Sequence, residues 1–220
     1  MSCWKNSLVK KSPGLWLCFG LVALLLLLGC GRRTVERHYY LLALPEFSLD
    51  SLHLSPINAA FRVMVVPVEV NPPFAQRHIA SRSRPYEIQY FVQHQWAAIP
   101  ETMLADFIKS YFARSKTFAY NIPLEYTTEP DFLIDSRLQA LEVIPSGGKL
   151  VAHLAMSLYL LDRFKGRVLV SHVFDREVPL KHKNLNEFAS VLSRLLLNEL
   201  IRFDRDIRQY IAKTKAPATQ

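Results

Sequence analysis

Thiol chemistry is confined to the start of this 220-residue chain. Its three cysteines are Cys3, Cys18 and Cys30, and none follows. The chain beyond Cys30 therefore has no disulfide, no thiolate nucleophile and no cysteine ligand for zinc. Cys30 is the cysteine that directly follows an apolar stretch, so it is the thiol whose neighbours could give it a reaction.

The other groups that could do chemistry are scattered. The seven histidines never lie three or four residues apart, so they form no helical metal pair. His153 and His172 fall on strands that we expect to be neighbours, where they would face each other as a metal pair or both face solvent. No nucleophile elbow, nucleotide-binding loop, zinc-protease motif or CxxC motif occurs. We expect no catalytic residue, no metal and no non-covalent cofactor.

The apolar stretch near the N-terminus has the form of a signal peptide. It covers residues 15–28 without a charge, and Lys5, Lys10 and Lys11 precede it. Its length suits the core of a signal peptide and is short for a membrane span, which needs about 20 apolar residues. The alternative is an uncleaved N-terminal anchor helix.

Leu27-Leu28-Gly29-Cys30 resembles a bacterial lipobox, with an aliphatic residue three places before the cysteine and a small residue just before it. The resemblance implies a signal peptide over 1–29 and the attachment of diacylglycerol and a fatty acyl group to Cys30. Such chains hold a protein stably on a bilayer, because each buried CH₂ contributes about 0.8 kcal/mol. Gly31, rather than an acid, follows the cysteine. In a Gram-negative bacterium this implies the outer membrane, with the protein facing the periplasm.

The strands and helices that would position the remaining side chains are expected after residue 37. Alternation of apolar and polar residues predicts strands there. They are expected at residues 38–44 and 62–70, as a hairpin at 78–92, and as an antiparallel meander at 131–180. The alternation on the first strand of the meander places these residues on one side: Phe132, Ile134, Ser136, Leu138 and Ala140.

Two apolar stripes at helical spacing predict two main helices. The first begins at Pro100, and the second is capped by Asn184 or Asn186 and carries its stripe to Ile207. Two helices packed on one antiparallel or mixed sheet, of about five to seven strands, make an α+β fold. The second face of that sheet is left for water, a partner or another copy of the chain.

These elements divide the chain into four parts. The expected parts are the signal peptide at 1–29, an acylated tether at 30–37, a single α+β domain at 38–207 and a polar, flexible tail at 208–220. The net charge is +8, and half of the residues are hydrophobic. No block of Lys or Arg longer than two follows the N-terminus, so nucleic acid is not an expected partner.

Residues 79–96 mix arginines with aromatic side chains. Arg, Tyr and Trp carry much of the binding energy of protein interfaces, so this segment could face a partner. The alternative is a hairpin whose aromatic residues cap the core. The candidate partner surface consists of Arg82, Arg84, Tyr86, Tyr90, Phe91 and Trp96.

Several of these features together resemble one family. They are the lipobox, the Tyr39-Tyr40-Leu41-Leu42 strand, the Val63–Val70 strand, the block from Ile79 to Ala97, the meander and the closing helix. In these features the chain resembles the ABC-type transport auxiliary lipoproteins. These are the small lipoproteins of Mce-type (MlaD-like) lipid transport systems, including the paraquat-inducible group.

The resemblance implies a non-enzymatic accessory subunit of a system that moves phospholipids between membranes. Its partners would be the membrane, through the lipid anchor, an Mce-domain protein and an ABC permease–ATPase complex. Self-association into a homo-oligomer stays open. One alternative is an envelope lipoprotein that assists outer-membrane assembly by binding a barrel protein or lipopolysaccharide. Another is a periplasmic hydrolase.

Overall fold

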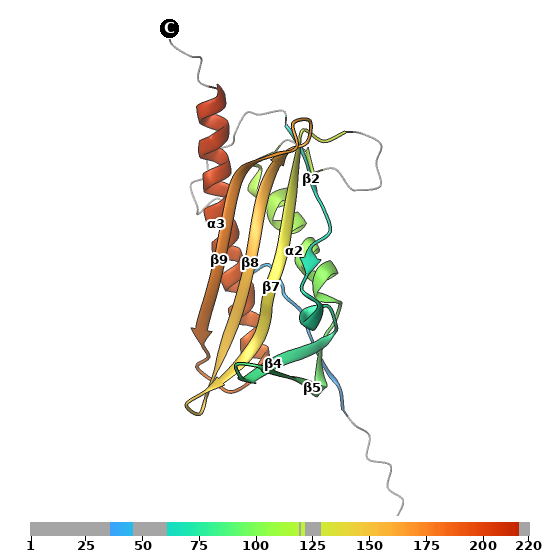
Figure 1. Ribbon diagram of the computed structural model, residues 1–220, viewed down its shortest axis with the longest axis vertical. Coiled ribbons are helices and arrows are strands. Elements are labelled where there is room, and N and C mark those ends of the chain that lie inside the picture. The colour runs from blue at the N-terminus through green and yellow to red at the C-terminus, as the bar shows by residue number, and fades with distance from the viewer. Residues whose placement is uncertain (1–35, 46–60, 119, 122–128, 216–220) are drawn as a thin grey trace, which may run out of the picture. The chain divides into compact units, whose positions relative to one another are not determined.

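The computed structural model of the chain describes residues 36–45, 61–118, 120–121 and 129–215. The predicted signal peptide, Cys30 and most of the tether lie outside the described residues, as does the end of the expected tail. Within the described ranges, the chain forms one mixed sheet and two α-helices (Figure 1). This confirms the predicted α+β class.

An antiparallel meander forms the longest part of the sheet. It consists of β7 (Phe132–Ser146), β8 (Lys149–Asp162) and β9 (Arg167–Pro179), paired in sequence order. Gly147 begins the first turn with a φ of 52°, and Gly166 ends the second with a φ of 59°. Glycine adopts such angles without steric cost, so both turns are tight. The predicted meander is confirmed.

Six further strands extend the sheet on the other edge of β7. They are β1 (His38–Tyr40), β2 (Arg62–Val65), β3 (Glu69–Val70), β4 (His78–Arg84), β5 (Glu87–Trp96) and β6 (Tyr120–Asn121). β2, β3 and β4 follow one another along that edge in parallel pairing with β7. β5 pairs with β4 as the predicted hairpin, β1 pairs with β5, and β6 pairs with β2.

The described residues therefore form nine strands rather than the five to seven expected. One cause is Pro67, which has no N–H to donate to a neighbouring strand. It divides the strand predicted over 62–70 into β2 and β3. The other cause is length, because β1, β3 and β6 have only two or three residues each and give little alternation to detect.

Both helices cover one face of the sheet. Figure 1 shows α3 (Leu185–Lys215) behind β8 and β9, and α2 (Pro100–Ser115) behind β7 and β2. A short 3-10 turn, η2 (Pro72–Phe74), precedes β4. The apolar sides of α2 and α3 form one core with the sheet, in which the side chains of Tyr111 and Phe203 are fully buried. No helix among the described residues is both long and apolar enough to cross a membrane.

The ends of α3 have clear physical causes. The backbone N–H of Glu187 donates to the side chain of Asn184 at 2.7 Å, so Asn184, rather than Asn186, is the N-cap. At the other end, α3 continues past Ile207, where the domain was expected to finish. Ile211 is buried and extends the apolar stripe by one turn, so the helix reaches Lys215 and includes the first part of the expected tail.

A β-bulge in β7 decides which side chains face the helices. The pairing with β8 shifts between Leu138 and Ala140. Before the bulge, Ile134 and Leu138 face the helices, and after it Leu141 does so instead. The expectation that Ala140 shares a face with Leu138 is therefore wrong, because the extra residue reverses the alternation. The opposite face of the meander, here called the open face, carries no helix in the described part of the chain.

Candidate partner-binding surface

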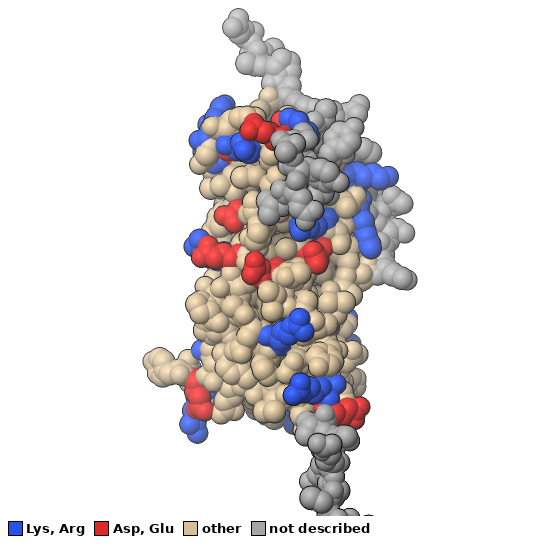
Figure 2. All heavy atoms as spheres, turned by 90° about the vertical axis from the view of Figure 1, so that its right-hand side faces the viewer, with Lys and Arg blue, Asp and Glu red and all other residues tan. Residues whose placement is uncertain are grey.

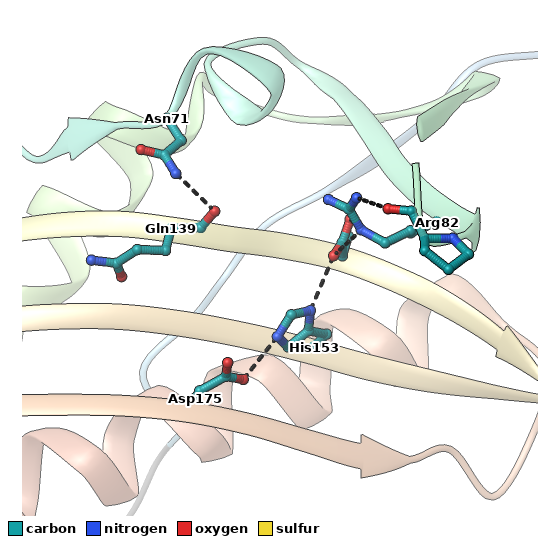
Figure 3. Close-up of polar contacts among 7 residues, drawn as sticks. Asn71, Arg82, Gln139, His153 and Asp175 are labelled. Carbon is teal, nitrogen blue, oxygen red and sulfur yellow. Dashed lines mark hydrogen bonds and ion pairs between the residues drawn. The ribbon is translucent and has the colours of Figure 1, made fainter. Parts of the chain in front are cut away.

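A chain of polar side chains crosses four strands on the open face. Arg82 on β4 donates from Nε to both carboxylate oxygens of Glu142 on β7, at 2.8 and 3.0 Å. Nδ1 of His153 on β8 lies 3.1 Å from Oε1 of Glu142, and its Nε2 lies 2.9 Å from Oδ1 of Asp175 on β9. Figure 3 shows the side chains in line across the strands. They tie β4 and the meander together.

The protonation states of Glu142 and His153 depend on each other. Burial alone would raise the pKa of Glu142, but hydrogen bonds from His153 and Arg82 hold it below its ordinary value. The hydrogen bond with Glu142 raises the pKa of His153. Each ring nitrogen of His153 faces a carboxylate, so the imidazolium donates from both. It has no free nitrogen to act as a general base, and the geometry fits a structural link.

Uncharged polar groups occupy the neighbouring part of the open face. Nδ2 of Asn71 donates to the backbone carbonyl of Gln139 at 3.2 Å (Figure 3). The side-chain amide of Gln139 donates to Oγ of Ser157 at 2.8 Å. The small side chains of Ala140 and Ala155 lie between these groups and the row of charged side chains that ends at Asp175. The middle of the open face is therefore largely polar and internally hydrogen-bonded, with the exposed Val173 of β9 opposite Ser157.

The β4–β5 hairpin presents four of the six residues of the predicted partner surface. The side chain of Arg84 is 79% exposed, and Tyr86 at the tip is fully exposed. Tyr90 is 38% exposed, and its hydroxyl donates to the carbonyl of Pro73. Phe91 is half-buried. Arg84, Tyr86 and Tyr90 are therefore available to another protein, and Phe91 is available in part.

The other two predicted residues have roles inside the protein. Trp96 is 1% exposed and packs against Phe188 of α3, with ring centroids 5.8 Å apart. The prediction that Trp96 lies on the partner surface is wrong, because the end of the hairpin directs this side chain into the core. Arg82 is 30% exposed, and its guanidinium is engaged by Glu142 and by the carbonyl of Pro85. It holds the hairpin against β7.

His153 and His172, which were expected on neighbouring strands, lie on opposite faces of the sheet. The register pairs His172 with Leu158 and His153 with Glu177. His172 therefore points toward α3, where its Nε2 lies 2.9 Å from Oε2 of Glu199. A metal pair between them is ruled out by this geometry. In the part of the chain that the structure describes, no three His, Cys, Asp or Glu side chains are arranged so that they could hold a metal ion.

A third histidine lies where the chain enters the sheet. Nδ1 of His94 on β5 lies 2.9 Å from the hydroxyl of Tyr40 on β1, and its ring stacks on His38 at 5.0 Å. Burial, and then the neighbouring His38, lower the pKa of His94. A neutral His94 can accept the proton of the Tyr40 hydroxyl, which fixes β1 beside β5.

Charge is sparse on the side that the hairpin and α2 share. Figure 2 shows acidic side chains in a band across the middle of this side, isolated Lys and Arg below the band, and further acidic side chains near the lower edge. The hairpin lies at that lower end in Figure 1. A partner at this end would therefore meet charges of both signs as well as the exposed tyrosines of the hairpin.

The sequence pattern did not reveal Glu142 or Asp175. Both appear in strands that were interpreted only through their apolar alternation. A signal for Glu142 exists, because it is the one charged residue in the apolar run from Ala140 to Ile144. A buried charge needs a partner, and that requirement could have pointed to a cation on a neighbouring strand.

Comparison with known proteins identifies similar chains. A family model described as ABC-type transport auxiliary lipoprotein component matches residues 49–201. Protein XCC0632 from Xanthomonas campestris has a similar structure, with a TM-score of 0.62 and 17% identity, over 73% of this chain and 92% of that one. A second structure, of an uncharacterized protein, has a TM-score of 0.61 and 13% identity, over 78% and 99%. These likenesses show the fold. No curated protein matches the sequence.

Proposed function

The chain belongs to the ABC-type transport auxiliary lipoprotein component family, and from this premise we propose that it is a non-enzymatic accessory subunit of an ABC transport system of the Mce type. In this proposal, acyl groups on Cys30 hold it on the outer membrane, facing the periplasm. It contacts an Mce-domain protein or the permease–ATPase complex, and the system moves phospholipids between the two membranes.

The observation that carries the proposal is the extent of the family match. Residues 49–201 include strands β2 to β9, all of α2 and more than half of α3. The match therefore covers most of the folded part of the chain and does not depend on the predicted signal peptide. A lipid tail cannot cross water unshielded, because each exposed CH₂ costs about 0.8 kcal/mol. A transport system must therefore be held at both membranes, and an acylated subunit suits one end.

A non-enzymatic role is supported by how the polar groups of the open face are used. His153 is the histidine that lies between two carboxylates, and both of its nitrogens are bonded to them. Glu142 is 1% exposed and is enclosed by cations. Groups held this firmly stabilise strands and do not offer a free base to a substrate.

The partner surface that we propose is the hairpin tip with its flank, formed by Arg84, Tyr86 and Tyr90. Tyr86 makes no hydrogen bond or ring contact within the described residues, so its fully exposed ring has no structural use in the isolated chain. Exposed Tyr and Arg side chains on a fixed hairpin give binding energy at low entropic cost.

Site-specific photo-crosslinking in intact cells tests this surface. A benzoylphenylalanine at Tyr86 should crosslink to an Mce-domain or permease subunit. The matched control is the same substitution at Phe164, an aromatic residue that is 66% exposed at the β8–β9 turn, at the opposite end of the meander (Figure 1). Equal crosslinking at both positions, or none at Tyr86, would refute the hairpin as the contact.

The anchor has its own test. Cys30→Ser removes the thiol that would be acylated, so the variant should take up no labelled fatty acid and should leave the membrane fraction. Co-purification of the wild-type protein with transporter subunits from gently solubilised membranes tests the functional assignment. A Cys30→Ser protein that is still labelled would refute the anchor, and wild-type protein recovered without any such subunit would refute the role.

A further inference from the structure

A groove with an unusual surplus of positive charge runs between α3 and the free edge of the sheet. It has a volume of about 300 Å³, and its lining includes Arg176 of β9 together with Arg194, Glu199 and Arg202 of α3. In the described residues, β9 pairs only with β8, so the groove opens along an unpaired strand edge. Figure 1 shows α3 and β9 side by side at this edge.

Glu199 forms the floor of the groove and orients two of the arginines. Its side chain is 4% exposed. Nε of Arg176 donates to its Oε1 at 2.9 Å, and Nη1 of Arg202 donates to the same oxygen at 3.1 Å. His172 engages the other oxygen at 2.9 Å. The carboxylate therefore draws two guanidiniums together at the groove.

The cations exceed what Glu199 can neutralise. Three guanidiniums line the groove, and Glu199 is the single carboxylate among the lining residues. Among the described residues, Arg194 donates to Oγ of Ser190 alone. Each guanidinium has five N–H donors, and within the described residues the Nη2 atoms of Arg176, Arg194 and Arg202 have no partner. An anion with several acceptor oxygens could be bound by these free donors.

Apolar side chains complete the wall beside the arginines. They are Val178 of β9 with Val191 and Leu195 of α3. A ligand that fits this groove therefore joins an anionic group to an aliphatic part. The volume equals that of about ten water molecules, which is enough for a phosphate ester and the first part of an attached chain, but not for two whole acyl chains.

We propose that the groove between α3 and β9 binds the phosphate headgroup of an anionic phospholipid. Its phosphate oxygens would accept from Arg176, Arg194 and Arg202, and the glycerol end of its acyl chains would lie on Val191 and Leu195. The inference rests on the proposed function, because it gives the transport accessory a direct contact with lipid. Arginine suits this ligand, since its planar donor pairs match phosphate oxygens.

Native mass spectrometry of the purified, acylated protein tests the proposal. The protein is released from micelles of an uncharged detergent that contain dihexanoyl phosphatidylglycerol, and the fraction carrying one lipid is measured. Arg194→Gln and Arg202→Gln should each weaken binding about tenfold, as expected for the loss of one charge-assisted contact. Arg114→Gln, an exposed arginine on α2, is the control and should bind as the wild type does.

Parallel titrations identify the source of the phosphate. Glycerol 3-phosphate should bind at least about tenfold more weakly than the lipid, because it lacks the aliphatic part. Equal affinity would overturn the lipid assignment in favour of a free phosphate ester. Tighter binding of a glutamate-rich peptide would overturn it in favour of an acidic segment of a protein.

The experiment distinguishes a failure of lipid binding from misfolding of a variant and from the absence of transport partners. No hydrogen bond or ion pair joins Arg194 to Glu199 in the described residues, so its substitution leaves the contacts of Glu199 intact even if Arg202→Gln is destabilising. No saturable lipid binding, or the same binding in both variants as in the wild type, would overturn the proposal. The assay contains no transporter subunit, so its failure is distinct from a failure of co-purification.

Discussion

Replacing Glu142 by Gln should destabilise the protein substantially, although the two side chains have the same shape. The carboxylate is 1% exposed and accepts hydrogen bonds from Arg82 and His153. The amide keeps one acceptor oxygen but loses the charge that both partners face. Removing one partner of a buried ion pair costs about 3–5 kcal/mol. Arg82 is 30% exposed and can be partly rehydrated, so we expect a loss of about 2–3 kcal/mol.

The size of this loss should depend on pH in a defined way. The pKa of Glu142 is lowered from 4.5, so its contribution is present above pH 4.5 and is lost as the pH falls through the lowered value. The pKa of His153 is raised from 6.5, so its contribution is present below pH 6.5 and is lost as the pH rises through the raised value. The difference between wild type and Glu142→Gln should therefore be largest between pH 4.5 and 6.5.

Urea unfolding of the acylated protein in uncharged micelles, followed by circular dichroism at several pH values, measures both effects. The control is Glu69→Gln, which removes an ion pair with Arg137 on the same sheet at 2.7 Å. Both side chains of that pair are more than half exposed, so its loss should cost at most about 1 kcal/mol. If the Glu142 and Glu69 variants lose the same stability, or if the loss does not change with pH, the proposed linkage is wrong.

Three further substitutions test the interior by the same unfolding assay. The hydroxyl of Ser136 is buried without a hydrogen-bond partner in the described residues, so Ser136→Ala should raise stability by about 1 kcal/mol; a loss would show a hidden partner. Asn184→Ala should cost about 1 kcal/mol, because it removes the cap of α3. Asp204→Ala should cost about 3–5 kcal/mol, since it removes the buried carboxylate that accepts from Tyr111, Thr117 and Arg208. The exposed Asp206→Ala should cost less than about 0.5 kcal/mol, and a similar loss in both Asp variants would refute the role of Asp204.

The sequence predicts the parts of this fold that depend on local periodicity. The meander is clear because β8 keeps a strict period of two, and its helix-facing residues Ala152, Leu154 and Leu158 are fully buried. The two helices are clear because their apolar stripes repeat over many turns. Proline and glycine mark the turns and the start of α2 by restricting or freeing the backbone.

Short strands and irregular pairing could not be predicted in this way. The bulge at Gln139 contains no glycine or proline, and its only trace is a change of phase in the alternation, from Leu138 to Leu141. That change places Glu142 on the open face instead of among the helices. One extra residue therefore determines which side of the sheet receives a buried charge, and the pattern of residue types alone gives little warning of it.

The candidate site was harder to predict than the fold, because its contacts join distant parts of the chain. Arg82 and Glu142 meet only through the parallel pairing of β4 with β7. The composition of residues 79–96 did indicate the hairpin, but could not separate Trp96, which closes the core, from Tyr86, which is fully exposed. An aromatic residue has the same appearance in a sequence whether it binds the core or a partner.

β9 contributes one residue to each of two charged networks, because successive side chains of a strand point to opposite faces of the sheet. Asp175 points to the open face and completes the chain that passes through His153. The next residue, Arg176, points to α3 and binds Glu199. Adjacent residues of a strand are held by the same backbone, so a displacement of this edge strand would strain both networks together. A ligand bound between α3 and β9 would therefore contact the strand that also supports the open face.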